Sequence, residues 1–304
     1  MATLAPAVSR RHAWVSALRP RTLWAGAAPV AVGTSVAVWE GGARAAPALA
    51  ALCGALLLQV ASNFANDVYD HERGSDGEDR LGPPRATQMG WIGAASMKRA
   101  TFAVLAAAAA IGLYLVAVGG WPVALAGALA MLAAWAYTGG PWPLGYHGLG
   151  DLAVFVFFGL VAVNGTTYVQ TLDWSPAALW ASLPVGALAT AILVVNNLRD
   201  IGTDARAGKR TLAVRIGARA TRLQYAGLLL FAGLWPVAAV AAGQAPLAVG
   251  LVWLSAGEAW RLRRGVAAAD AGALNPHLGG TARLLAIYCG LLSAGYLVSA
   301  GLAR

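Results

Sequence analysis

Long apolar runs separated by polar connections dominate the pattern of this chain. Nine runs have the length of a membrane span, at about 23–39, 46–66, 101–118, 121–138, 150–172, 177–197, 223–241, 245–262 and 284–302. A transmembrane helix needs about 20 mostly apolar residues, whereas the strands of a membrane barrel alternate in segments of about ten. The continuous runs therefore predict an all-α, polytopic membrane protein with nine transmembrane helices.

The composition supports the same class of protein. Of 304 residues, 59% are hydrophobic and only 12% are charged, a much smaller charged share than in a usual soluble domain. This balance excludes a disordered tail and an ordinary soluble enzyme. Both cysteines, Cys53 and Cys289, lie in apolar runs, which argues against a disulfide or a cysteine metal site. We interpret residues 1–304 as a single membrane-embedded domain.

The 22 Lys and Arg residues are distributed unevenly between the two predicted sides of the membrane. All but Arg44 and Arg304 fall before the first span, in the 67–100 and 198–222 connections, or around 261–283. Because Lys and Arg accumulate in cytoplasmic segments, we expect a cytoplasmic N-terminus and an outside C-terminus. The net charge of +9 then reflects topology and not nucleic-acid binding, and residues 1–22 form a basic cytoplasmic segment at the membrane interface.

The acidic residues gather at the ends of two predicted spans, both on the cytoplasmic side. In the first group, the spacings of three and four place four side chains on one helix face: Asn63, Asn66, Asp67 and Asp70. In the second group, Asn196, Asp200 and Asp204 recur every four residues, which again predicts one shared face. Asp200 follows Asp67 by 133 positions, so the pattern indicates an internal pseudo-repeat of four helices.

Stacked carboxylates repel one another on a bare helix, so we expect a cation to neutralise them. Mg²⁺ prefers hard oxygen ligands and is typically held by one or two carboxylates together with substrate phosphates. Neighbouring bases are available for the other phosphate oxygens: Arg73, Arg80, Arg85, Arg199, Lys209 and Arg210. These residues predict a magnesium–diphosphate site at the mouth of an apolar bundle. Glu72, Glu78 and Asp79 are interpreted instead as solvated loop carboxylates paired with arginines.

Two segments carry a resemblance to a known family. They read NFANDVYDHERGSDGEDRLGPPRATQMG over residues 63–90 and NNLRDIGTDARAGKRTLAVRIG over residues 196–217. With YTGGP at 137–141 and YHGLGD at 146–151, they resemble the UbiA superfamily of intramembrane prenyltransferases, and within it the 1,4-dihydroxy-2-naphthoate prenyltransferases of menaquinone synthesis. The resemblance covers roughly residues 14–220. The superfamily's first motif often has a further Asp where this chain has Gly74, and Asp76 is a candidate replacement.

The resemblance implies transfer of a polyprenyl chain from its diphosphate to dihydroxynaphthoate with loss of CO₂, in the plasma membrane of a bacterium and on its cytoplasmic side. It implies these residues for catalysis and Mg²⁺ binding: Asp67, Asp70, Asp200 and Asp204, with Lys209 as a further catalytic residue and Asn66 and Asp76 as additional metal ligands. It implies these contacts to the diphosphate: Asn63, Asn66, Asn197, Arg73, Arg85, Arg199 and Lys209.

Two alternatives remain open at the level of sequence. A transporter also combines repeated helices with buried polar groups, although its coupling sites usually lie near the midplane and not at one mouth. A related prenyltransferase would act on hydroxybenzoate or homogentisate. The polar residues of the fifth predicted span also allow two interpretations, because they either line a pocket or hydrogen-bond across helices: Asn164, Thr166, Thr167 and Gln170.

Overall fold

The computed structural model describes residues 8–77 and 79–302, and within these residues it contains helices and connections but no strand. The α-helices are α1 (Arg10–Leu18), α2 (Leu23–Trp39), α3 (Ala45–Glu72), α4 (Ala94–Gly119), α5 (Trp121–Ala136), α6 (Gly150–Val154), α7 (Ala162–Thr171), α8 (Pro176–Arg199), α9 (Ile201–Arg206), α10 (Leu212–Ala241), α11 (Ala256–Ala268) and α12 (Asn275–Leu302). Shorter helical pieces are η1 (Pro20–Thr22), η2 (Leu144–His147), η3 (Phe155–Val161), η4 (Leu247–Ser255) and η5 (Ala271–Leu274). The all-helical class predicted from the sequence is therefore confirmed.

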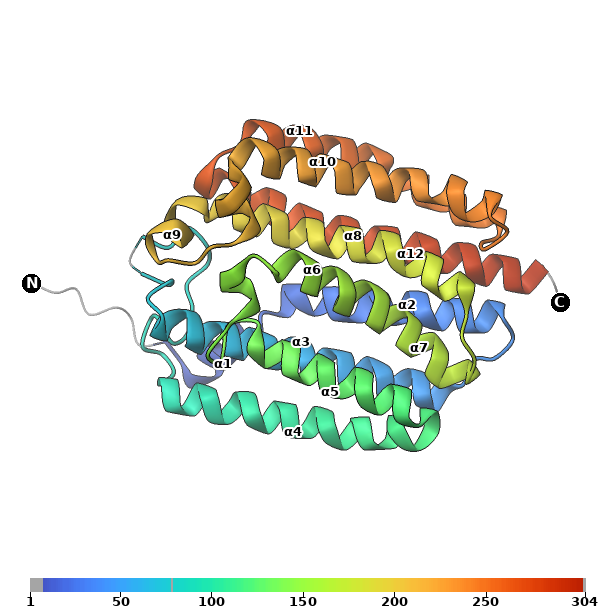
Figure 1. Cartoon of the computed structure of the whole chain (residues 1–304), viewed down its shortest axis with the longest axis horizontal. Coiled ribbons are helices and arrows are strands. Elements are labelled where there is room, and N and C mark those ends of the chain that lie inside the picture. The colour runs from blue at the N-terminus through green and yellow to red at the C-terminus, as the bar shows by residue number, and fades with distance from the viewer. Residues whose placement is uncertain (1–7, 78, 303–304) are drawn as a thin grey trace, which may run out of the picture.

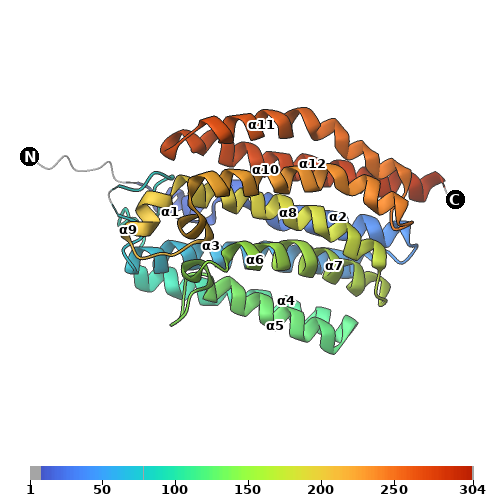
Figure 2. The same ribbon diagram turned by 45° about the horizontal axis from the view of Figure 1, so that its top comes forward.

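The long helices lie side by side in a bundle, roughly along one common direction (Figures 1 and 2). Short α9 and the connection between α3 and α4 lie at the same end of this bundle, and α12 finishes at the opposite end (Figure 1). The two acidic motifs, which are far apart in sequence, are therefore brought to one end of the molecule.

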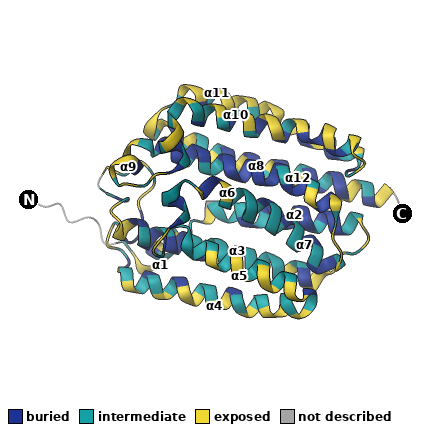
Figure 3. Cartoon of the chain, in the orientation of Figure 1, coloured by how far each residue is buried: buried dark blue, intermediate teal, exposed yellow. Residues whose placement is uncertain are grey.

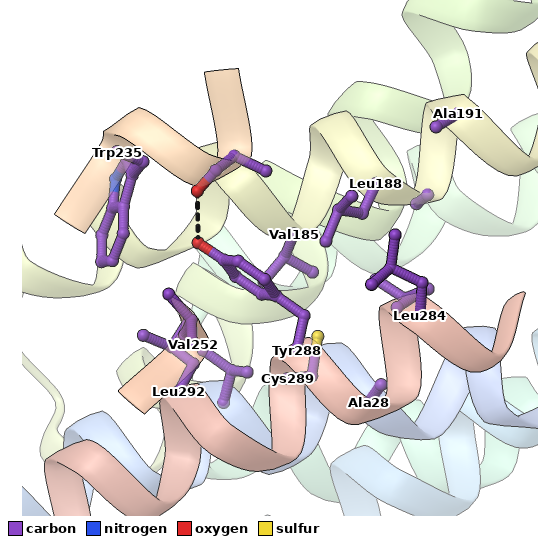
Figure 4. Packing of buried hydrophobic residues seen from close by; sticks show 14 of the residues in the cluster. Ala28, Val185, Leu188, Ala191, Trp235, Val252, Leu284, Tyr288, Cys289 and Leu292 are labelled. Carbon is purple, nitrogen blue, oxygen red and sulfur yellow. Dashed lines mark hydrogen bonds between the residues drawn. The ribbon is translucent and has the colours of Figure 1, made fainter. Parts of the chain in front are cut away.

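Helix α8 is the centre of the packing. Over an apolar stretch of 18 residues, 72% of α8 is buried, against 11% in α3 and in α4, where intermediate and exposed residues predominate (Figure 3). Apolar residues of α2, α8, α10 and α12 form the larger core, and within it the Tyr288 hydroxyl donates a hydrogen bond of 2.8 Å to the Ala232 carbonyl (Figure 4). Because this bond satisfies a hydroxyl inside an apolar core, it removes the cost of burying that group.

Small residues bring α8 close to the span formed by α6, η3 and α7. A Cβ atom placed on Gly159 would lie 2.6 Å from the Cα atom of Gly186, a separation that a real side chain does not tolerate. The η3 piece is a single stretch of π-helix, a form that occurs mostly as local bulges inside α-helices. Glycine therefore allows backbone-to-backbone packing here, as small residues do in membrane helices generally.

Each of the nine apolar runs falls in helical structure, but the lengths differ from the expectation. Within the described residues, six helices are long and apolar enough to cross a membrane, and a seventh span results if α1 and α2, which meet at 45°, are counted together. Helix α5 has only 16 residues, and the 245–262 run is divided between 3₁₀ piece η4 and α11. These apolar helices make the chain an integral membrane protein.

Several helices continue beyond the apolar runs that predicted them. Helix α3 extends to Glu72, α4 already begins at Ala94, and α10 already begins at Leu212. Most of the predicted 198–222 connection is consequently helical, whereas the 67–100 connection is helical only at its two ends. Hydropathy marks a boundary at the first charges, whereas helical hydrogen bonding continues outside the apolar layer, where water and ion pairs satisfy polar side chains.

Candidate active site

The inner face of α3 carries the first acidic motif. Asn63, Asp67 and Asp70 are exposed by only 3%, 1% and 2%, so the predicted stacking at spacings of three and four points into the protein. The Asn63 amide donates to the Leu18 carbonyl at 3.0 Å and to the Thr22 hydroxyl at 2.9 Å. Asn63 therefore ties the segment before α2 to α3.

The connection after α3 folds back onto the Asp67 carboxylate. The backbone N–H groups of Ala86 and Thr87 donate to its two oxygens at 3.1 and 2.8 Å. Arg85 donates to the Asn66 carbonyl, and the Asn66 side-chain oxygen accepts a bond of 2.9 Å from Thr138. Two backbone donors and a buried carboxylate thus fix this connection against the end of α3.

Asp70 joins three other segments of the chain. The Arg85 guanidinium lies 3.0 Å from its carboxylate, and the Tyr146 hydroxyl donates to it at 2.9 Å. Lys209 Nζ lies 3.7 Å from the same carboxylate. The Tyr146 hydroxyl is also 2.6 Å from the Ser75 hydroxyl, and burial together with Asp70 raises the pKa of Tyr146 far above its ordinary value. Tyr146 is therefore a neutral donor to Asp70.

Lys209 connects the two acidic motifs. Its Nζ lies 3.7 Å from Asp204 Oδ1 as well as 3.7 Å from Asp70 Oδ1. Although burial works to lower it, the two carboxylates hold the pKa of Lys209 above its ordinary value, so the side chain is a cation at neutral pH. This single charge neutralises part of both motifs.

Asp204 keeps one oxygen available. Its residue is 4% exposed, and Oδ2 is buried with no hydrogen-bond partner among the described residues. Burial raises the pKa of Asp204 to about 6, against the opposing charge of Lys209. A buried carboxylate oxygen without a partner is costly, and a cation bound there would remove that cost.

The second motif is not carried by one continuous helix. Helix α8 ends at Arg199, and Asp200 takes a non-helical conformation before α9 begins at Ile201. At this turn, the Arg199 guanidinium donates to both carboxylate oxygens of Asp200, at 2.7 and 2.6 Å. Arg199 also donates to Asn196 at 2.8 Å and to Asn275 at 2.9 Å. Its guanidinium is therefore largely occupied within the protein.

Asp76 belongs to the same ion network as Asp70. Arg80 pairs with it, and Arg85 Nε lies 2.9 Å from its second oxygen, although the two atoms are not aligned for a hydrogen bond. Burial raises the pKa of Asp76 while Arg85 and Arg80 oppose that change. Asp76 therefore lies beside Asp70, and Arg85 faces both carboxylates.

Other predicted residues lie at the edge of the cluster or apart from it. Arg73 is exposed and donates to the carbonyls of Thr138 and Gly140, and its guanidinium lies 5.3 Å from the centre of the Tyr146 ring. Asn197 is buried, and no side-chain hydrogen bond joins it to the cluster within the described residues. Glu72 pairs with Lys98 at 2.7 Å and Asp79 pairs with Arg206, both partly or largely exposed, as expected for solvated carboxylates. Glu78 lies outside the described residues.

Arg19 is a site residue that sequence reasoning did not select. It has a left-handed backbone conformation, with φ of 51°, before Pro20, and its Nη2 atom is buried without a partner in the described chain. Burial and the neighbouring Arg85 lower the pKa of Arg19 to about 9, so it stays charged at neutral pH. Asp67 and Asp76 are close enough to act in the opposite direction. The signal available in the sequence was only a basic residue before proline.

No group of three or more His, Cys, Asp or Glu side chains is arranged to hold a metal ion in the part of the chain that the structure describes. The carboxylates are each held by a cation or by backbone donors. The donor set nevertheless suits a hard divalent ion, since it consists of carboxylate and amide oxygens and includes the unpartnered Asp204 Oδ2.

A long apolar cavity of about 990 Å³ lies among α2, α3, α4, α5 and the α6–α7 span. Tyr137 lines it near the acidic motifs, Trp174 and Ser175 line it at the opposite end, and Ala and Gly residues form much of its wall. Asn164 and Thr166 line this cavity, whereas Thr167 donates to the Gly33 carbonyl on α2 at 2.9 Å. Gln170 likewise reaches α2, at the Thr34 hydroxyl. Both interpretations of these polar residues therefore hold, each for a different pair.

The fold and the site define an all-helical membrane protein with a dense cluster of buried charges beside a long apolar cavity. Residues 27–275 match the model of the UbiA prenyltransferase family. The chain belongs to this family, which confirms the resemblance drawn from the motifs.

Several relatives share one name. The 1,4-dihydroxy-2-naphthoate octaprenyltransferase of Mycobacterium tuberculosis is 48% identical over 223 residues, which cover 72% of this chain and 75% of that protein. The protein of the same name from Escherichia coli is 44% identical over 229 residues, covering 73% and 74%.

Solved structures agree with the fold. A UbiA homolog from Aeropyrum pernix is similar with a TM-score of 0.68 at 17% identity, covering 90% of this chain and 97% of that one. A UbiA homolog from Archaeoglobus fulgidus bound to DMAPP and Mg²⁺ has a TM-score of 0.66 at 14% identity, covering 95% and 98%.

Proposed function

We propose that this protein transfers a polyprenyl chain from polyprenyl diphosphate to 1,4-dihydroxy-2-naphthoate, with release of diphosphate and CO₂, in menaquinone synthesis. The observation that carries the proposal is the position of Lys209, 3.7 Å from a carboxylate of each acidic motif, at the end of the bundle where Tyr137 lines the apolar cavity. Relatives at 41–48% identity that are named for this reaction support it.

The carboxylates are proposed to hold Mg²⁺. Asp67 and Asp70 form one set of ligands, Asp200 and Asp204 the other, with Asn66 and Asp76 as further oxygen donors. When bound, the metal supplies Lewis-acid stabilisation of the charge that develops on the departing diphosphate. A solved relative bound to DMAPP and Mg²⁺ has this fold, which supports the choice of metal.

Three cations are proposed to bind the diphosphate: Lys209, Arg85 and Arg19. Each already faces carboxylates at this end of the bundle, so each is positioned without a large rearrangement. Arg199 is assigned a positioning role instead, because its bonds to Asp200 and two asparagines leave little of the guanidinium for phosphate. Asn63 fixes the segment that carries Arg19.

The apolar cavity is proposed to accommodate the prenyl tail and to exclude water from the reacting carbon. The allylic carbon–oxygen bond breaks and its electron pair leaves with diphosphate. The electron-rich ring then forms the new carbon–carbon bond, and the carboxylate departs as CO₂, which returns its bonding electrons to the ring. Tyr137 lines the cavity close to the acidic motifs, where its ring face can stabilise the allylic cation.

An acceptor panel tests the proposed function. Purified protein in lipid nanodiscs is expected to prenylate dihydroxynaphthoate and to release CO₂ in equal amount, in the presence of Mg²⁺. Hydroxybenzoate and homogentisate serve as competing acceptors of the alternative kind. Faster turnover of either one would replace the acceptor assignment, and failure with every acceptor and tail length would refute the prenyltransferase reaction and favour transport.

We further propose nine membrane spans, with the N-terminus and both acidic motifs on the cytoplasmic side of the plasma membrane. The test uses two exposed positions, Asp270 between α11 and α12, and Asp173 between α7 and α8, in a Cys53→Ala background. In intact cells, a membrane-impermeant maleimide is expected to label Asp173→Cys, and to label Asp270→Cys only after lysis. The reverse pattern would overturn the orientation, and equal labelling of both would overturn the odd number of intervening spans.

A further inference from the structure

One short segment contacts both carboxylates of the first acidic motif. This segment, residues 81–88, contributes Arg85, which lies 3.0 Å from Asp70 and also pairs with Asp76. Its backbone N–H groups at Ala86 and Thr87 donate to Asp67. The geometry of the first motif therefore depends on where the 81–88 segment lies.

The start of the same segment is attached to α12 through Asn275. The Asn275 amide nitrogen donates to the Leu81 carbonyl at 2.8 Å, and its oxygen accepts from Arg199 Nη1 at 2.9 Å. The next residue, Gly82, lies against the Arg199 guanidinium, since a Cβ placed there would be 3.1 Å from Nη2. An asparagine at a helix start usually caps its own helix. This one instead bridges two other segments.

These contacts form a continuous chain between the motifs. It runs from Asp67 and Asp70 through the 81–88 segment to Asn275, and then through Arg199 to both oxygens of Asp200. Lys209 faces a carboxylate of each motif but is not attached to the 81–88 segment. A further link between the same regions, the pair of Asp79 with Arg206, is largely exposed and therefore weak. The link through Asn275 uses both polar atoms of its amide. Its bond from Arg199 is partly buried, and its bond to the Leu81 carbonyl is exposed but short, at 2.8 Å.

We propose that Asn275 is a positioning residue that fixes the 81–88 segment relative to the second acidic motif, and so sets the spacing between the two halves of the diphosphate site. It touches no reacting group. Its donor half holds the first motif through Leu81, and its acceptor half orients Arg199 and thereby Asp200. The expected effect on catalysis rests on the proposed function. The expected effect on the position of the 81–88 segment does not depend on that function.

Asn275→Asp separates the two halves of this role. The aspartate keeps an acceptor for Arg199 but has no N–H for the Leu81 carbonyl. In the full-length protein without substrate, hydrogen exchange at the Ala86 and Thr87 amides is expected to become roughly tenfold faster, the loss expected for one hydrogen bond. Exchange within α8 should not change. Asn275→Ala removes both halves and should also speed exchange around Asp200.

Kinetics supply the second measurement. In Asn275→Asp, KM for the prenyl diphosphate is expected to rise several-fold while KM for the aromatic acceptor stays constant. A role in stability alone would lower Tm and the amount of active enzyme without changing either KM. Asp79→Asn is the matched control, because it breaks the exposed link between the same regions, and it should behave like the unmodified protein.

The proposal is overturned if exchange at residues 86 and 87 in Asn275→Asp equals that of the unmodified protein or of Asp79→Asn. It is also overturned if exchange rises but both KM values stay constant in an enzyme that turns over. Because exchange is measured without substrate, faster exchange in a protein that prenylates no acceptor refutes the proposed function and leaves the positioning role supported.

Discussion

Asp70→Asn is expected to abolish most prenyl transfer, lowering kcat by roughly 10²- to 10³-fold, the scale seen when one electrostatic contact to a transition state is lost. Asp70 is the most connected carboxylate of the site, since Arg85, Lys209 and Tyr146 all meet it. Asparagine keeps the size of the side chain but removes the charge that balances two cations. The measurement is the initial rate at saturating substrate.

The same variant is expected to lose stability. Breaking a buried ion pair by neutralising one partner costs about 3–5 kcal/mol, because the other charge remains buried without compensation. Thermal unfolding in detergent should therefore show a clear decrease in Tm. Asp79→Asn is the control, since Asp79 is exposed and water screens its pair with Arg206. Equal effects of the two substitutions would contradict the assignment of Asp70.

Asp204→Asn is expected to raise the Mg²⁺ concentration needed for half-maximal activity by at least about tenfold, the lower end of the effects seen when a metal site is perturbed. The reason is the buried Asp204 Oδ2, which lacks a hydrogen-bond partner in the described chain and is a ready ligand. A chelator should abolish turnover in the unmodified protein, and added Mg²⁺ should restore it. Activity that persists in the chelator would refute the metal assignment.

The Mg²⁺ requirement should also depend on pH. Burial raises the pKa of Asp204 to about 6, so below this value a proton occupies the carboxylate and competes with the metal. The half-saturating Mg²⁺ concentration is therefore expected to increase as pH falls through about 6 and to level off above it. In Asp204→Asn this contribution disappears. Glu72→Gln, at an exposed pair with Lys98, should keep both the affinity and its pH dependence.

Local spacing predicted the first motif well. Positions three and four apart on one helix must share a face, and α3 turns that face inward over Asn63, Asp67 and Asp70. The same rule placed the second motif at the end of a helix but did not predict that the helix breaks within the motif. Asp200 leaves helical geometry at the end of α8, and this turn directs its carboxylate to Arg199. Hydropathy and periodicity contain no signal for such a break.

Contacts between segments far apart in the chain could not be predicted from the sequence. Tyr146 meets Asp70 across 76 positions, and Asn275 meets Leu81 across 194. Neither residue stands out by charge or by spacing within its own segment. Their contacts form only when packing around α8 brings the ends of several helices together. Arg199 is a related case, because its charge predicts a phosphate contact and the fold adds hydrogen bonds to Asp200 that the sequence argument did not include.

The ion network bears on whether the protein needs its metal ion in order to fold. In the described residues, cations of the chain itself face the buried carboxylates of both motifs, with Lys209 shared between them. Small metal domains often stay unfolded until their ion arrives, because folding and binding are a single event. Because these carboxylates already have internal counter-ions, we expect the bundle to fold without Mg²⁺. Removing the metal should then lower the rate of turnover and leave the amount of folded protein in the membrane unchanged.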